Sequence, residues 1–410
     1  MNTSTSAKSC DTLLREAKTA LSEGENFLAY DIAEKIPDKG AQLSPEKIHV
    51  MALALARSGS LKRARALVAM LPDTDDTEIV GLKSRIFKDM ALAASNAEER
   101  RSFFLKSARM SSDIFLKKRN WYNGINAASC LFMAGDREAS RRLVRDEVLP
   151  LCRAEANQDV WLDATIGECN LLLGDFHTAA VSYRKAVAAA TATGQYGSIS
   201  STLRQLRMLI AAIGDEAATL WNNLSLPRIA VFSGHMIDRP GRQCPRFPPS
   251  AEEQVRHALR EVIDRQAIRI AFASCACGGD ILFLEEVLSA GGECFVVPPL
   301  PLPTTIQNSV AFAPGGWETR LEAIRAHPKS RFLDPECDET GENDAIVYDF
   351  ANRYLLGLAL LKTRALGFPL LGVCVWDGKE SGLAGGTDSA VRMWREHALP
   401  VEIVKPEVPA

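Results

Sequence analysis

The fold is decided by one short stretch, Arg228-Ile229-Ala230-Val231-Phe232-Ser233-Gly234-His235, in which an apolar strand runs straight into a glycine turn. Similar apolar runs occur at residues 268–273, 294–297, 370–376 and 401–404. Helical patterns alternate with them at residues 250–264, 280–290, 304–311, 319–326, 348–366 and 388–397. This alternation predicts a Rossmann-like, doubly wound parallel α/β domain over residues 227–410.

Three glycine breaks separate these strands from the helices that follow. They are Ser233-Gly234-His235, Gly278-Gly279-Asp280 and Gly385-Gly386-Thr387. Strand-to-helix turns of a parallel sheet meet at one edge, so we expect the three to line one crevice for a phosphorylated, nucleotide-like ligand. Gly385-Gly386-Thr387 is the best phosphate cradle, because two glycines free consecutive N–H groups; the alternative is an ordinary flexible turn.

Charged residues near the first two breaks have two interpretations each. Arg242 either pairs with phosphate or forms a salt bridge to Asp238 or Asp264. Asp280 either caps its helix or faces the ligand. Glu285, five residues further on, is expected to reach the pocket floor.

Other residues of this half are weaker candidates. We expect residues 246–249 to form an extended strap over the pocket rather than to contribute chemistry. Asn352 and Arg353 on the long helix and Asp377 are secondary candidates, Asp377 with turn formation as its alternative. Cys275 and Cys277 lack a companion ligand, so small residues in a tight turn are favoured over a metal site.

The motifs of this half resemble the YpsA-like branch of the SLOG superfamily, which also holds the Lonely Guy phosphoribohydrolases. The likeness rests on residues 232–235, on Gly279-Asp280 followed by Glu285, and on Gly385-Gly386-Thr387, in order over residues 228–404. It implies a nucleotide-derived ligand, with Asp280 facing its ribose hydroxyls and an acidic residue acting in hydrolysis. The chain lacks the glutamate that follows the late glycine motif in the hydrolases.

The first half, residues 1–225, shows a helical repeat. Glycine turns recur at Gly24, Gly59, Gly135, Gly174 and Gly214, at intervals of 35, 76, 39 and 40 residues, and the long interval predicts a further turn near residues 95–96. Such a period predicts an α-solenoid of tetratricopeptide (TPR)-like repeats. In the best unit, residues 161–190, Gly174 is followed by Ala179, Tyr183 and Ala186, which match the small and aromatic positions of that repeat.

Residues 121–128 of this half resemble the helical repeat region of apoptosis-signal-regulating kinases. We expect the concave face of the repeats to hold a protein partner. The alternative is that the array only caps and dimerises the second half, which makes the chain a homo-oligomer. His49 and His177 stand alone in sequence, so no metal site is expected here.

Composition narrows the function further. A net charge of −3 and a pI near 6.2 argue against a general nucleic-acid or anionic-membrane surface. No apolar run reaches the roughly 20 residues that span a bilayer. Residues 1–5 show no export signal and the cysteines follow no disulfide pattern, so we expect a cytoplasmic protein.

Three functions remain open on the sequence. The first is a signalling sensor, whose α/β domain binds a nucleotide-derived ligand and whose repeats engage a partner. The second is a nucleotide hydrolase that cleaves an N-glycosidic or phosphate bond with Glu285 or Asp280. The third is a scaffold with a degenerate α/β half. The sensor leads, because the pocket glycines are intact while no complete catalytic set or cofactor motif is present.

Overall fold

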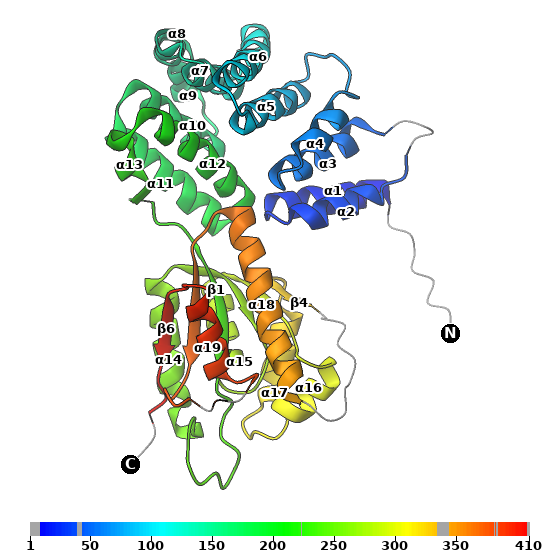
Figure 1. Cartoon of the computed structure of the whole chain (residues 1–410), viewed down its shortest axis with the longest axis vertical. Helices are drawn as coiled ribbons and strands as arrows, with labels where there is room; N and C mark the ends of the chain where they lie inside the picture. The colour runs from blue at the N-terminus through cyan, green and yellow to red at the C-terminus, as the bar shows by residue number, and fades with distance from the viewer. Residues whose placement is uncertain are drawn as a thin grey trace. The chain divides into compact units, whose positions relative to one another are not determined.

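The computed structural model describes residues 9–38, 43–222, 224–333, 344–380, 382 and 384–407. Residues 1–5, on which the expectation about export rests, lie outside these ranges. The chain divides into two compact units, Met1–Ser225 and Leu226–Ala410 (Figure 1). None of the helices in the described ranges combines the length and the apolar character that a bilayer crossing requires.

The first unit, which we call the helical unit, is built from helix pairs joined by short turns. The pairs are α1 (Cys10–Ser22) with α2 (Asn26–Glu34), α3 (Pro45–Arg57) with α4 (Leu61–Val68), α5 (Thr77–Ala93) with α6 (Ala97–Lys118), α7 (Trp121–Met133) with α8 (Arg137–Leu143), α10 (Val160–Leu173) with α11 (Phe176–Ala192), and α12 (Tyr196–Ile213) with α13 (Asp215–Asn222). Helix α8 continues through a π-helical turn, Val144–Val148, into α9 (Leu149–Ala154).

The predicted turns are confirmed. Each of the five glycines lies between the two helices of a pair with φ between 82° and 104°, a left-handed conformation that favours glycine. The turn predicted near residues 95–96 joins α5 to α6 without glycine, and Asn96 caps α6 by accepting from the N–H of Glu99. In the best repeat, Tyr183 is buried against Gly167 of the preceding helix.

The first helices of successive pairs form a closed ring, and we call them the inner helices. In ring order they are α1, α3, α5, α7, α10 and α12, and α12 in turn contacts α1. The closure is tight, because a Cβ added to Gly197 of α12 would lie 2.5 Å from the backbone oxygen of Leu21. Arg57 of α3 donates to the same oxygen at 2.7 Å and to Oγ of Ser201 at 3.2 Å. The inner face of the repeats is therefore a ring interior rather than an open groove.

The second unit, which we call the α/β unit, contains a six-stranded parallel sheet in the order β4-β3-β2-β1-β5-β6. Its strands are β1 (Arg228–Gly234), β2 (Ile268–Ala273), β3 (Glu293–Val296), β4 (Ser330–Phe332), β5 (Leu370–Val375) and β6 (Val401–Val404). All but β4 were predicted. β4 is a three-residue, half-buried edge strand and lacks the apolar run on which the prediction relied.

Helices cover both faces of the sheet, which confirms the predicted doubly wound fold (Figure 1). One layer holds α14 (Glu252–Arg265), α15 (Gly279–Ser289) and α17 (Trp317–Ala326), and the other holds α18 (Asp344–Leu366) and α19 (Thr387–Glu396). Two short helices lie in the connections, η2 (Pro249–Ala251) and α16 (Leu302–Ser309). Strand order reverses between β1 and β5, and Gly234 pairs with Val375 at their carboxyl ends. In open α/β sheets ligands bind outside such a reversal point.

Candidate functional site

A pocket of about 530 Å³ opens beyond the carboxyl ends of β1 and β5, at this reversal point. The structure brings eight of the candidate residues to its wall: Ser233, Gly234, His235, Arg242, Asp280, Gly385, Gly386 and Thr387. Gly278, Gly279 and Glu285 do not line it. The three glycine breaks therefore converge on one place, but their residues do different things there.

The first two breaks hold the strand and helix together. The Cα atoms of Gly234 and Gly279 are so close that a Cβ on either would lie 2.9 Å from the other. Gly278 has φ +96°, and a Cβ there would lie 2.6 Å from the amide nitrogen of Ile237. These glycines are thus needed for close packing of β1 on α15, one of the roles of glycine in dinucleotide-binding turns.

Asp280 fastens the two turns to each other. Its Oδ1 accepts from the N–H of Gly234 and its Oδ2 from the N–H of Ala276, both at 3.1 Å. Burial raises the pKa of this carboxyl to about 7, while the two backbone donors act in the opposite direction. Asp280 lies in the pocket wall, but both of its oxygens are already engaged by backbone donors.

His235 is held by an ion pair between Asp377, which follows β5, and Arg246, which precedes η2. Its Nε2 lies 3.1 Å from Oδ1 of Asp377, and Nη2 of Arg246 lies 2.9 Å from the same Nε2 and 3.2 Å from Nδ1. Burial lowers the pKa of His235, and the nearby Arg246 lowers it further against the effect of Asp377.

Asp377 combines both of the roles considered for it. Its Oδ1 accepts from the N–H of Lys379 at 3.1 Å, which is the turn interaction, and it also holds His235. Burial acts to raise the pKa of Asp377, but these hydrogen bonds outweigh it and the pKa is lowered. The carboxylate therefore stays ionised beside the pocket at neutral pH.

Arg242 forms the salt bridge that was one of its two interpretations. Its Nε lies 3.4 Å from Oδ1 of Asp238, and it donates to the backbone oxygen of Cys244 at 2.9 Å. The side chain is 43% exposed and still borders the pocket. Asp238 also accepts from the N–H groups of Arg246 and Phe247, which fixes the strap over the site.

The third break begins helix α19. Gly386 is its N-cap residue, with φ −86° and ψ 174°. Gly385 is packed against α18, because a Cβ there would lie 2.7 Å from Cβ of Tyr348, and its backbone oxygen accepts from Asn352 at 3.2 Å. The start of α19 therefore faces the pocket from a fixed position, and helix N-termini favour anions.

Two pocket residues were missed by the sequence interpretation. Arg246 lies on the segment expected to be only a strap, yet its guanidinium contacts His235 and lies 3.5 Å from Oδ2 of Asp377. Tyr348 lies near the start of α18 in the pocket wall, 3.3 Å from Oγ of Ser309. The position of Arg246 among prolines was a usable signal for that residue, whereas nothing near Tyr348 in sequence pointed to the site.

The cysteines of the second break are buried. Burial raises the pKa of the Cys275 thiol, and raises that of Cys277 to about 12. Within the described ranges, no cluster of three or more His, Cys, Asp or Glu side chains is suitable for a metal ion. The geometry is that of small residues in a tight turn.

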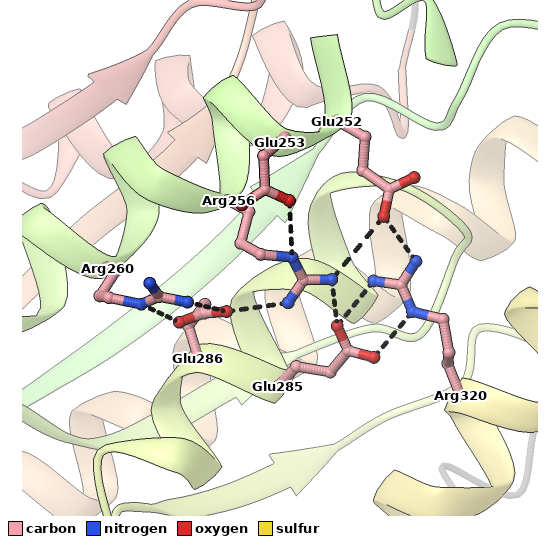
Figure 2. A network of polar contacts seen from close by, with 7 residues as sticks. All are labelled: Glu252, Glu253, Arg256, Arg260, Glu285, Glu286 and Arg320. Atoms are coloured by element: carbon pink, nitrogen blue, oxygen red, sulfur yellow. Dashed lines mark hydrogen bonds and ion pairs between the residues drawn. The ribbon is translucent and has the colours of Figure 1, made fainter. Parts of the chain in front are cut away.

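Glu285 lies in an ion-pair network that joins α15 to α14 and α17 (Figure 2). It does not line the pocket. Glu285 lies five residues after Asp280 on the same helix, which places the two side chains about 140° apart around the helix axis. The carboxyl groups of Asp280 and Glu285 therefore face different neighbours. Oε2 of Glu285 lies 2.6 Å from Arg320 of α17 and 2.9 Å from Arg256 of α14. Glu286 extends the network, 2.8 Å from both Arg256 and Arg260. The network ties α14, α15 and α17 together.

We expect Glu285→Gln to weaken folding without affecting ligand binding. Loss of the charged hydrogen bonds to Arg256 and Arg320 should lower the free energy of unfolding by about 1.5–3 kcal/mol. Urea denaturation measures this, with Glu253→Gln as control, because Glu253 is 85% exposed at the edge of the network. A hydrolase that uses Glu285 predicts the reverse, namely lost turnover at unchanged stability.

Comparison with known proteins identifies the repeats. Residues 28–131 match the family model TPR-S, Tetratricopeptide Repeats-Sensor. Together with the helix pairs, this shows that the N-terminal region consists of TPR-type repeats. No curated protein matches the chain.

Two solved structures are similar at low identity. A thermophilic TPR protein of Thermus thermophilus is 14% identical with a TM-score of 0.38, over 50% of this chain and 99% of that chain. LpoA of Haemophilus influenzae is 12% identical with a TM-score of 0.21, over 97% of this chain and 65% of that chain.

Proposed function

We propose that the protein is a sensor, in which the α/β unit binds a nucleotide-derived ligand and the helical unit engages a protein partner. The observation that carries the proposal is the pocket at the strand-order reversal, where the start of α19 and the first glycine break meet. The resemblance of residues 228–404 to the SLOG superfamily supports the same ligand class.

The chemistry of the pocket wall fits such a ligand. Arg242 and Arg246 supply guanidinium donors, and the N-terminus of α19 favours negative charge, so phosphate oxygens find donors on two sides. Asp238 and Asp388 lie in the same wall, and Oδ1 of Asp238, which makes no hydrogen bond within the described residues, suits a ribose hydroxyl. A wall of both signs favours a phosphorylated sugar over a simple anion.

The hydrolase alternative is weaker on this geometry. Glu285 is engaged by two arginines, and both oxygens of Asp280 accept from backbone N–H groups. Sensing needs neither residue as an acid or base.

The partner of the proposed sensor binds outside the ring, because the contact of α1 with α12 closes the inner face.

We expect Arg242→Ala to weaken the binding of ADP by about 10- to 150-fold, the equivalent of one charge-assisted contact. Isothermal titration calorimetry of the full-length protein with ADP and other ribonucleoside mono- and diphosphates measures the affinity. Arg325→Ala is the control, since Arg325 also pairs with an acidic residue of its own helix, Glu322, but lies outside the pocket. Unchanged affinity in Arg242→Ala, with protein that melts normally, would assign this arginine to the salt bridge alone.

A further inference from the structure

Three arginines converge on the interior of the helical ring. Arg57 of α3, Arg85 of α5 and Arg204 of α12 line adjoining hollows, of about 610 Å³ for the first and about 400 Å³ for the other two. Trp161 of α10 borders both hollows, so they are neighbouring parts of one interior. This interior belongs to the helical unit alone.

These guanidinium groups carry buried nitrogens that make no hydrogen bond to any group in the described part of the chain. They are Nε of each of the three, together with Nη2 of Arg204. The nearest carboxylate oxygen to Nε of Arg85 is Oδ2 of Asp89, at 3.7 Å. Buried polar groups in folded proteins are normally hydrogen-bonded, so several unpaired donors in one hollow indicate a missing acceptor.

The buried positive charge of the interior also indicates that an anionic acceptor is missing. Burial lowers the pKa of Arg57 well below its ordinary value, and Arg85 and Arg204 lower it further. Burial and Arg85 likewise lower the pKa of Arg204 to about 10. Positive charges that are buried away from water and repel one another destabilise the fold unless a bound anion compensates them.

The acidic residues nearby do not balance this charge. Glu168 already accepts from Ser129 and from Nε2 of Gln205, and burial raises its pKa. Gln205 in turn accepts from Lys88 at 2.7 Å, which adds a further cation to the wall. Asp89 is the carboxylate that lies within 4 Å of Arg85, and Glu46, Asp76 and Glu78 line the hollow of Arg57. Oδ1 of Asp76 already accepts from two backbone N–H groups.

We propose that the ring interior is a second ligand site, which binds a small phosphorylated molecule through the unpaired nitrogens of Arg57, Arg85 and Arg204. Tyr122 and Trp161, 40% and 36% exposed, border the same hollow and offer flat surfaces for a ring of the ligand. The size of the hollow suits a small molecule. A partner helix about 10 Å across needs an open groove, which the contact of α1 with α12 removes.

The test uses the full-length protein and hydrogen–deuterium exchange with ADP, pyrophosphate or adenosine. We expect ADP and pyrophosphate, but not adenosine, to protect residues 45–57, 77–93 and 196–213, which hold the arginines. This protection should persist in Gly386→Asp, which blocks the pocket of the α/β unit. In Arg204→Met it should require about 10- to 150-fold more ADP, the equivalent of one charge-assisted contact.

A second readout separates a ligand site from a structural role. The melting temperature is measured in the Gly386→Asp background, in which the ring interior is the proposed ADP site that remains. Arg204→Met removes a buried, poorly paired charge, so the free protein should melt at the same or a higher temperature while losing the stabilisation by ADP that persists in Gly386→Asp alone. Arg184→Met is the control, because it removes the same charge from the exposed surface of α11. This variant should change neither property.

Three outcomes overturn the inference. Protection confined to residues 233–242 and 385–388 would leave the α/β pocket as the proposed ligand site and remove the ring interior. A lower melting temperature of free Arg204→Met, with ADP protection unchanged, would make Arg204 a structural residue. Absence of protection anywhere would contradict this inference and the proposed function together.

Discussion

Replacement of Gly386 by aspartate is expected to abolish ligand binding in the pocket of the α/β unit while leaving the fold intact. Gly386 is the N-cap residue of α19, and its φ of −86° is accessible to any residue. Aspartate is among the preferred N-cap residues, so we expect unchanged or slightly higher stability. The new carboxylate would take the place of the ligand's phosphate at the helix N-terminus. The affinity for ADP in the α/β pocket should fall by at least about 100-fold, or about 2.8 kcal/mol.

Two controls isolate the charge at this position. Gly386→Asn places an equally good N-cap of similar size without the negative charge, and it should retain most of the affinity. Gly357→Asp adds the same charge on α18, at a position where a Cβ meets no atom within 4 Å and which lies outside the pocket. Equal affinities of the wild type and Gly386→Asp for ADP would show that the start of α19 does not hold the anion.

Gly234→Val is expected to give the largest loss of stability in the α/β unit. The added Cβ alone would lie 2.9 Å from the Cα of Gly279, a backbone atom that cannot move without shifting α15. Overpacking of this kind costs about 1–3 kcal/mol, and the displacement would also disturb the hydrogen bond from Gly234 to Asp280, worth about 1.5–3 kcal/mol. Together we expect a loss of about 2.5–6 kcal/mol in the free energy of unfolding.

Thermal and urea denaturation of the full-length protein measure this loss. Gly357→Val is the control, because it makes the same substitution on α18 where the added atoms have space, and valine is slightly better than glycine in a helix. A Gly234→Val protein as stable as the wild type would mean that β1 and α15 are not packed through these two glycines.

The sequence predicted the architecture where local patterns carry it. Apolar runs followed by glycine turns located β1, β2 and β5, and the spacing of Gly135, Gly174 and Gly214 located the later helix pairs. Strand β4 was missed because three half-buried residues at a sheet edge produce no apolar run. The strands that were predicted and the one that was missed have the same explanation, because the sequence prediction relied on short-range hydrophobic pattern.

Contacts between distant residues were harder to predict. His235 and Asp377 lie 142 positions apart and meet because β5 pairs with β1, an adjacency that no local motif reports. Glu285 was expected in the pocket because its motif position was considered without its direction on the helix, which turns it toward Arg320. Strand order and helix phase therefore decide which candidates share the site.

The arginines of the ring interior illustrate the same limit. Arg57, Arg85 and Arg204 belong to three different inner helices and look in sequence like ordinary charges on helix surfaces. Only closure of the ring, where Gly197 packs on the end of α1, brings their side chains into one interior. A period predicts repeats, but it does not predict how far their superhelix turns.

The most direct test of the central claim is mass spectrometry of small molecules released from purified full-length protein, with the wild type and Gly386→Asp prepared in parallel. If the α/β pocket binds a nucleotide-derived ligand, the wild type should release such a compound in near-stoichiometric amount and Gly386→Asp should release much less. Absence of any nucleotide-type compound from the wild type, or equal amounts from the two proteins, would contradict the assignment of this pocket.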